Sequence, residues 1–224
     1  MATPESALPD WIRQSEPVDG VQVDIGFAIS PNFYYGPEND FSPTQWEALR
    51  EPLVQPAISL VERHFVLSAD AAGKEGELCR HYRDVLDKAG RHGRDPRRGA
   101  YFWNRPVVHA PDGLVLSFPW HDHFIEGRLF IESLDTRQAG EVFSYYEQGW
   151  AFELHLYEGT LYMHESDPDS GETHRNLRFD HEPVRAQAAG VLARTEALIA
   201  RLAREFGQDY WTRACSHYAR GPLA

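Results

Sequence analysis

The chain has 224 residues, of which 42% are hydrophobic and 25% charged, and its formal net charge is -12. This length is ample for a hydrophobic core, and the composition is typical of a soluble globular protein. The acidic balance argues against general electrostatic binding to nucleic acid, which needs an excess of Lys and Arg, and leaves two interpretations, basic partners or solubility alone.

The first residues give no sign of a membrane or secretory destination. The segment from Met1 to Gly20 is rich in Pro, Glu, Asp and Ser and lacks the apolar run of a signal peptide. No apolar stretch of the chain approaches the length of a membrane span. Cys79 and Cys215 are too few for a disulfide framework, and their spacing is not that of a zinc site. We therefore expect a cytoplasmic protein without a membrane partner.

In chain order, residues 1–19 are predicted to form a flexible tail and residues 20–224 a single domain. Val21 to Ile29 alternates apolar and polar residues, which predicts a half-buried strand. A helix is predicted to begin at Ser42 and to bury Trp46, Leu49 and Leu53, with a kink or break at Pro52 and Pro56. A second helix is predicted over Glu75 to Lys88.

The next segment, residues 88–99, reverses the local charge. It contains Arg91, Arg94, Arg97 and Arg98 between glycines. A solvated connection is favoured over a phosphate site, because no helix N-terminus or Walker pattern accompanies the arginines.

From Ala100 onward the chain is predicted to be mostly strand. Tyr101 to Ala110 and Leu114 to Phe118 flank a hairpin turn, and two more strands are predicted over His123 to Leu134 and Glu141 to Tyr146. The last long helix is predicted to begin at Asp180 and to end at Gly207, and a short helix over Tyr210 to Tyr218 follows. Helices, then strands, then helices predict an α+β fold, in which an antiparallel meander packs against N-terminal helices and a long C-terminal helix.

The meander itself is predicted over Trp150 to Phe179. Leu154, Leu156, Leu161 and Met163 alternate with polar residues around a turn at Glu158–Gly159. Keeping the apolar side chains on one face sets the register. The pairs expected across the turn are Tyr157 with Thr160, Leu156 with Leu161, Leu154 with Met163 and Glu153 with His164. The pairs expected across the second loop, Asp167 to Gly171, are Leu161 with Leu177 and His164 with His174.

The polar face of this meander is the first candidate site. Glu153, His164 and His174 form one expected row, and His155, Tyr162 and Asn176 form the next. Two histidines and a carboxylate suit zinc or non-haem iron, but a row across three strands spans about 10 Å, which is wide for one ion. A polar outer face of the sheet is therefore favoured over a metal site.

Two other fragments have the residue types of metal sites. His121 and His123 would share one face of an extended strand, with His109 as a conditional third ligand. The segment from Asp167 to Glu172 has the spaced carboxylates and glycine of a calcium loop, but its flanks are strands and a turn of this composition needs no ion. We assign no catalytic residue, metal or cofactor. The loop is still acidic, with Glu165, Asp167, Asp169 and Glu172 close together.

A resemblance accompanies the acidic loop. The segments Gly140 to Trp150 (GEVFSYYEQGW) and Leu161 to Glu172 (LYMHESDPDSGE) resemble immunity proteins of bacterial polymorphic toxin systems. The resemblance implies an inhibitor that occludes the active site of a toxin, and it transfers no catalytic residue.

Function is therefore expected in binding rather than in catalysis. The hypothesis is a non-enzymatic, immunity-type inhibitor of a basic toxin or effector domain, and the alternative is a metal-dependent enzyme with a His/Glu site on the sheet. An adaptor without a toxin partner is a third possibility. The residues predicted to bind the partner are the polar and acidic side chains of the meander: Glu153, His155, Tyr157, Tyr162, His164, Glu165, Asp167, Asp169, Glu172 and His174.

Overall fold

The computed structural model describes residues 8–37, 43–118, 123–147 and 149–212. Contacts within the chain define two compact units. The meander unit comprises Met1–Val23, Val108–Leu114 and Leu129–Ala189, and the mixed unit comprises Asp24–Val107, Val115–Arg128 and Gly190–Ala224. The prediction of a single domain over residues 20–224 did not distinguish these two units.

The α+β class is confirmed, since both units combine helices with sheets in which most strand pairs are antiparallel. In the described ranges, no helix is both long and apolar enough to cross a membrane.

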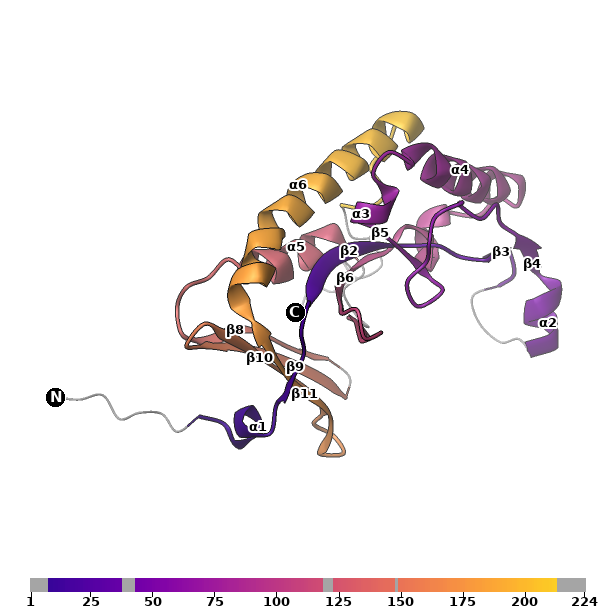
Figure 1. Ribbon diagram of the computed structural model, residues 1–224. Coiled ribbons are helices and arrows are strands. Elements are labelled where there is room, and N and C mark those ends of the chain that lie inside the picture. Colours follow the sequence, from indigo (N-terminus) through magenta and orange to yellow (C-terminus); the bar gives the residue numbers. More distant parts are fainter. Residues whose placement is uncertain (1–7, 38–42, 119–122, 148, 213–224) are drawn as a thin grey trace, which may run out of the picture. The chain divides into compact units, whose positions relative to one another are not determined.

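The meander unit is built on a five-stranded sheet in the order β1-β11-β10-β9-β8 (Figure 1). Its strands are β1 (Glu16–Pro17), β8 (Gly140–Glu147), β9 (Trp150–Tyr157), β10 (Thr160–Asp167) and β11 (Glu172–Asp180). The strands from β8 to β11 pair antiparallel with their neighbours along the chain, as the predicted meander requires. Leu154, Leu161 and Met163 are at most 1% exposed, so the apolar face forms a core.

The register between β9 and β10 matches the prediction at every pair. Tyr157 lies opposite Thr160, and Glu153 lies opposite His164. Glu158 and Gly159 both have positive φ, of 47° and 79°, as a type I′ hairpin turn requires. Positive φ is the conformation that glycine adopts at no steric cost, which explains Gly159 at this position.

The predicted register between β10 and β11 is wrong by two residues. Leu161 lies opposite Phe179 and His164 lies opposite Asn176, instead of Leu177 and His174. The strands continue to Asp167 and Glu172, so the connection is shorter than the predicted loop, and the register shifts between Glu165 and Ser166. A shift of two residues keeps the apolar side chains on the buried face, so the hydrophobic pattern alone could not detect it.

The segment predicted as a strand over His123 to Leu134 is instead a helix, α5 (Phe124–Ser133). Its apolar residues follow helical spacing: Phe130, Ile131 and Leu134 are at most 1% exposed, whereas Leu129 is 58% exposed. Phe130 packs edge-on against Phe143 and Phe152, with ring centroids 5.3 and 6.0 Å apart, and so covers the apolar face of the sheet.

The long C-terminal helix is confirmed as α6 (His181–Phe206), which begins in the meander unit and ends in the mixed unit. In the meander unit, Val184 and Ala188 are buried, and the His181 ring contacts the Leu134 carbonyl at 2.8 Å. Gly207 follows with φ 69°, as expected of a C-terminal cap. The short helix predicted over Tyr210–Tyr218 lies mostly outside the described residues, and residues 210–212 form bends.

The predicted tail over residues 1–19 contains regular structure in its described part. A helical turn, α1 (Asp10–Arg13), is followed by β1, which pairs parallel with β11. The Val18 amide donates a hydrogen bond to the Arg178 carbonyl at 2.9 Å. Ile12 is only 4% exposed, so this segment is part of the packed unit.

The mixed unit contains a four-stranded sheet in the order β5-β2-β6-β7 and a two-stranded pair, β3-β4. Their bounds are β2 (Gln22–Ala28), β5 (Phe65–Leu67), β6 (Asn104–His109), β7 (Val115–Ser117), β3 (Asn32–Tyr34) and β4 (Arg50–Pro52). The predicted hairpin at Pro111–Gly113 is confirmed, with Gly113 at φ 92°, and its turn falls in the segment Val108–Leu114 that is counted with the meander unit.

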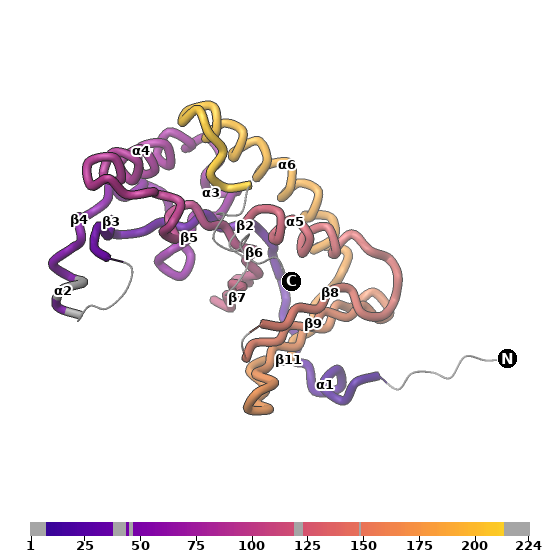
Figure 2. The backbone as a smooth tube through the Cα atoms, turned by 180° about the vertical axis from the view of Figure 1, so that it is seen from behind, coloured from indigo at the N-terminus to yellow at the C-terminus, as the bar shows by residue number. Residues whose placement is uncertain are grey.

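The helices of this unit include α4, which matches the second predicted helix. Their bounds are α2 (Pro43–Ala48), α3 (Ser68–Ala71), α4 (Glu75–Arg91) and the 3-10 turns η1 (Pro96–Arg98) and η2 (Ala100–Phe102). In Figure 2 α4 lies beside β3, which it contacts. The helix predicted near Ser42 is present as α2, but its predicted continuation past Leu53 is wrong, because α2 ends at Ala48 and the chain then enters β4. Pro52 favours this edge strand over a helix, since it cannot donate a helical hydrogen bond.

Strand β2, an inner strand of the four-stranded sheet, contains a buried carboxylate. The alternating sequence pattern predicted a solvent-facing residue at this position. Asp24 of β2 is only 3% exposed. Its carboxylate accepts hydrogen bonds from the Ser68 hydroxyl, the Ala69 amide and its neighbouring amide at Ile25, and it pairs with Arg194 Nη2 of α6 at 3.2 Å. A buried carboxylate is tolerated only when it is paired and hydrogen-bonded, and here these bonds join β2, α3 and α6.

We predict that Asp24→Asn lowers the free energy of unfolding by about 2–4 kcal/mol, because Arg194 then loses its counter-charge in a partly buried site. The measurement is equilibrium denaturation with urea. Asp70→Asn, at an exposed position of α3, is the matched control and should change stability by less than about 0.5 kcal/mol. Equal effects of the two substitutions would contradict the anchoring role of Asp24.

Candidate functional site

The free end of the β10–β11 hairpin is ordered by its own side chains. The Asp167 carboxylate accepts hydrogen bonds from the amides of Asp169 and Ser170, at 2.8 and 3.2 Å. The Gly171 amide donates to the Asp167 carbonyl at 2.8 Å, and Gly171 has φ 74°. Asp167 therefore closes the turn that the composition predicted.

An exposed aromatic ring from β8 lies beside this turn. The Tyr146 hydroxyl donates a hydrogen bond to Asp169 Oδ1 at 3.4 Å, and Tyr146 is 62% exposed. Gly149 lies so close to the turn that a Cβ there would stand 3.3 Å from Asp169 Oδ2 and 3.5 Å from Asp167 Oδ1. The end of β8 and the hairpin end thus form one surface. We call Tyr146, Asp167, Asp169 and Glu172 the acidic tip.

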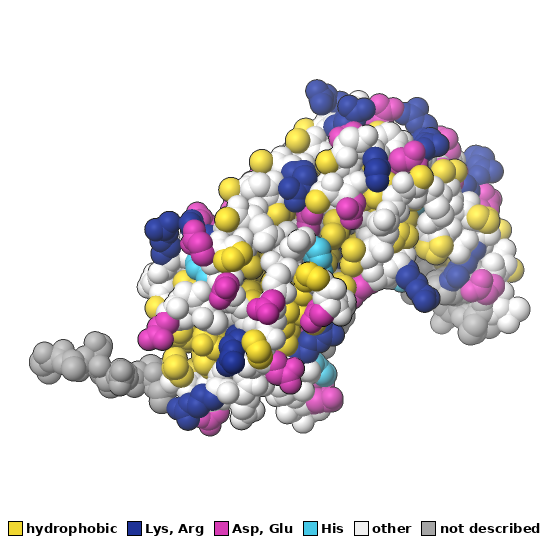
Figure 3. Space-filling model, viewed as in Figure 1, with side chains coloured by type: hydrophobic (Ala, Val, Ile, Leu, Met, Phe, Trp, Pro, Cys, Tyr) yellow, Lys and Arg dark blue, Asp and Glu magenta, His cyan; other side chains and the backbone are white. Residues whose placement is uncertain are grey.

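The electrostatics of the acidic tip keep it negatively charged. Hydrogen bonds from the Ser170 hydroxyl, and from the amides of Ser170 and Asp169, lower the pKa of Asp167. The charge of Asp169 raises the pKa of Tyr146, so the phenol stays protonated and remains a donor. Asp169 and Glu172 are exposed. In Figure 3 acidic side chains are visible at the free end of this hairpin, low in the view.

The predicted row of Glu153, His164 and His174 does not exist. Glu153 and His164 lie opposite each other, but the third position belongs to Asn176, whose Oδ1 is 2.6 Å from His164 Nδ1. His174 falls in the register shift and lies 3.8 Å from Glu172 instead.

In the described part of the chain, no group of three or more His, Cys, Asp or Glu residues could hold a metal ion. Of the His121 and His123 pair that has the residue types of a metal site, His121 lies outside the described residues.

The polar face of the sheet is partly covered by the N-terminal segment. Trp11 stacks on the ring of His164 with centroids 5.1 Å apart and meets His155 edge-on at 5.3 Å. His155 is consequently 8% exposed, with Nε2 at 3.3 Å from Glu153. The His155 ring is thus buried inside the unit, whereas His164, Tyr157 and Tyr162 are half-buried on the same face.

Glu165 also differs from its predicted role in the acidic loop. Its carboxylate accepts a hydrogen bond from Trp150 Nε1 at 2.9 Å and lies 3.7 Å from Arg175 Nε. Its side chain is 14% exposed. The residue lies opposite Phe152, on the apolar side of the sheet. Of the predicted partner-binding residues, the structure thus brings Asp167, Asp169 and Glu172 together at an exposed end, close to His174.

Sequence reasoning missed Tyr146. In β8, Phe143 and Tyr145 are only half-buried, and a register shift between Glu141 and Phe143 changes which residues face the core. The signal that could have found Tyr146 is its position in the strand. Tyr146 directly follows Tyr145, and successive strand residues point to opposite faces, so one of the two tyrosines must face outward. Tyr146 also lies near the end of its strand, just before a glycine turn.

We predict that Asp167→Ala speeds water exchange at the amides of Asp169 and Ser170, which lose their acceptor, but not at Gly171, which keeps a backbone acceptor. NMR exchange measurements test this. Because the pKa of folded Asp167 is lowered, wild-type protection should persist below the ordinary carboxylate range and disappear as the pH falls through the folded pKa. Glu172→Ala, which removes an equal charge from the hairpin, should leave Asp169 and Ser170 unchanged; equal acceleration in both variants would disprove the role of Asp167.

Comparison with known proteins adds no family to these observations. No family model, no curated protein and no solved structure matches the chain. The resemblance to immunity proteins therefore stays a prediction, and the site rests on the contacts of this chain.

Proposed function

We propose that the protein is a non-enzymatic binder of a basic protein, and that the acidic tip is its contact surface. The observation that carries the proposal is the contact between Tyr146 and Asp169 above a turn that Asp167 holds in place. Tyrosine is enriched among the residues that dominate binding energy, and carboxylates beside it attract a cationic partner. A preformed turn reduces the ordering entropy that binding must overcome.

The class of partner follows from charge. The chain has a formal net charge of -12, which steers cationic proteins toward it and repels nucleic acid and acidic surfaces. The two segments that resemble immunity proteins supply Tyr146 and the hairpin end, and these meet at the acidic tip. This coincidence supports the finer proposal that the partner is a toxin domain of the same bacterium and that the protein neutralises it by occluding its active site.

The metal-dependent enzyme is not proposed, since no observation favours it. The histidines that suggested it are engaged with Trp11, Glu153 and Asn176.

We predict that the double variant Asp167→Lys with Asp169→Lys slows association with the partner about tenfold or more at low salt and weakens the salt dependence of the rate. The partner is captured from the native host with the wild-type protein and identified by mass spectrometry. Its association rate is then measured by surface plasmon resonance.

The control is Asp70→Lys with Asp87→Lys, which changes net charge equally at exposed positions of α3 and α4. It should retain more of the association rate than the tip variant. An equal loss in both variants would show that only net charge matters and would overturn the assignment of the surface. A captured partner that shows no growth inhibition when expressed alone would overturn the toxin proposal while leaving the binding proposal standing.

A further inference from the structure

The mixed unit contains a pocket of about 380 Å³ next to the arginine-rich segment after α4. This volume lies within the range of small-molecule sites. The lining combines aromatic rings, charged side chains and glycines: Phe33, Tyr34, Gly36, Gly93, Arg94, Asp95, Arg98, Gly99 and Tyr101. A solvated connection was predicted for this segment, but β3 and η2 bring aromatic rings to the arginines.

The aromatic wall of the pocket is rigid. Phe33 is 1% exposed and stacks on Tyr101, with centroids 5.2 Å apart and planes 20° from parallel. The Tyr34 amide donates a hydrogen bond to the Tyr101 hydroxyl at 2.8 Å, which fixes the second ring to the backbone of β3. Burial raises the pKa of Tyr101, so this wall is uncharged at neutral pH. Phe33 is enclosed between Tyr101 and His92, whose ring centroid lies 6.1 Å away, so it supports the wall from behind. The aromatic side chains left to contact a planar ligand are Tyr34 and Tyr101.

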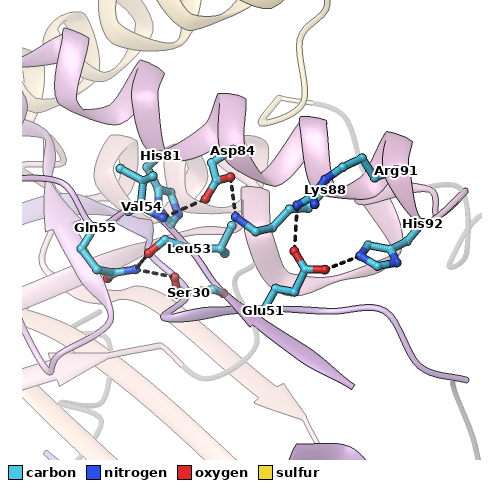
Figure 4. A network of polar contacts seen from close by, with 10 residues as sticks. All are labelled: Ser30, Glu51, Leu53, Val54, Gln55, His81, Asp84, Lys88, Arg91 and His92. Carbon is cyan, nitrogen blue, oxygen red and sulfur yellow. Dashed lines mark hydrogen bonds and ion pairs between the residues drawn. The ribbon is translucent and has the colours of Figure 1, made fainter. Parts of the chain in front are cut away.

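The arginine segment is held in place by contacts between α4 and β4. Figure 4 shows Glu51 between Arg91 and His92, with each contact at 2.7 Å. His92 also stacks on Tyr35 with centroids 4.1 Å apart. Gly93 and Arg94 follow directly, so the position of the pocket edge is set by this network.

Arg94 supplies positive charge that the described residues do not neutralise. Its Nε and Nη2 donate to the Tyr35 carbonyl at 3.0 and 2.6 Å, and no carboxylate of the described chain pairs with it. A guanidinium has five N–H donors, so Nη1 retains donors for a ligand. Among the described residues of the lining, the one acidic residue, Asp95, accepts two hydrogen bonds from the Arg97 guanidinium, each at 2.9 Å. These hydrogen bonds are the main reason why the pKa of Asp95 is lowered.

We propose that this pocket binds a small organic anion with a planar ring, of about the size of a nucleoside monophosphate. The ring packs against Tyr34 and Tyr101 in the pocket lining, and the phosphate or carboxylate group contacts Arg94 and Arg98. Arginine favours such groups because its planar fork can donate two parallel hydrogen bonds. This site is separate from the acidic tip and does not depend on the partner proposed above.

The test is isothermal titration of the full-length chain with adenosine 5′-monophosphate, phenyl phosphate, adenosine and inorganic phosphate. We expect at least one of the two ring-bearing phosphates to bind with a Kd of about 1 mM or tighter, and adenosine and inorganic phosphate to bind about tenfold more weakly or not at all. Saturable binding of neither ring-bearing phosphate would overturn the proposal. Equal binding of adenosine and its monophosphate would overturn the role of the arginines, and equal binding of inorganic phosphate would overturn the role of the wall.

Variants then locate the site. Arg94→Gln and Arg98→Gln should each weaken binding about tenfold, whereas Arg94→Lys should retain part of it because the charge remains. Arg80→Gln removes the same charge from α4, away from the pocket lining, and should bind like the wild type. Thermal unfolding monitored by circular dichroism confirms that each variant is folded. Wild-type affinity in both folded pocket variants would place the anion elsewhere and overturn the proposal.

Discussion

The burial of one face of the β8–β11 sheet is the constraint on which the proposed contact surface depends. Strand side chains alternate between faces, so a slip of one residue would expose Leu154 and Met163 and bury Glu153 and His164. The observed register avoids this exchange and brings the end of β8 to the hairpin end, where Tyr146 meets Asp169. The acidic tip is therefore a consequence of core packing, and the overall charge of the chain adds only long-range attraction.

The sequence predicted those parts of the structure that local pattern controls. The β9–β10 pairing was predictable because the turn at Gly159 leaves one register that buries the apolar residues. The β10–β11 pairing was not, since a two-residue shift preserves the same faces and only the hydrogen bonds of Asp167 decide where the turn closes. Helix α5 was missed because its apolar and aromatic residues suit either a strand or a buried helix.

Other features depend on contacts between segments far apart in sequence, which no local pattern reveals. Trp11 covers the polar face through the rings of His155 and His164, and with this cover His155 is buried and His164 is half-buried. The sequence pattern predicts Asp24 as a solvent-facing strand residue, because its counter-charge, Arg194, lies 170 positions later in the chain. The pocket likewise needs Phe33 beside Arg94. The chain thus combines an anionic surface in one unit with a cationic pocket in the other, although its net charge alone predicts only the first.

Amide hydrogen exchange of the full-length protein, free and bound to its captured partner, tests the central claim most directly. If the acidic tip is the contact surface, slowed exchange should concentrate at Tyr146 and at the Asp167–Gly171 turn, two segments that are separated in sequence and meet in the fold. Slowed exchange that is confined to other segments, with the tip unchanged by the partner, would contradict the account.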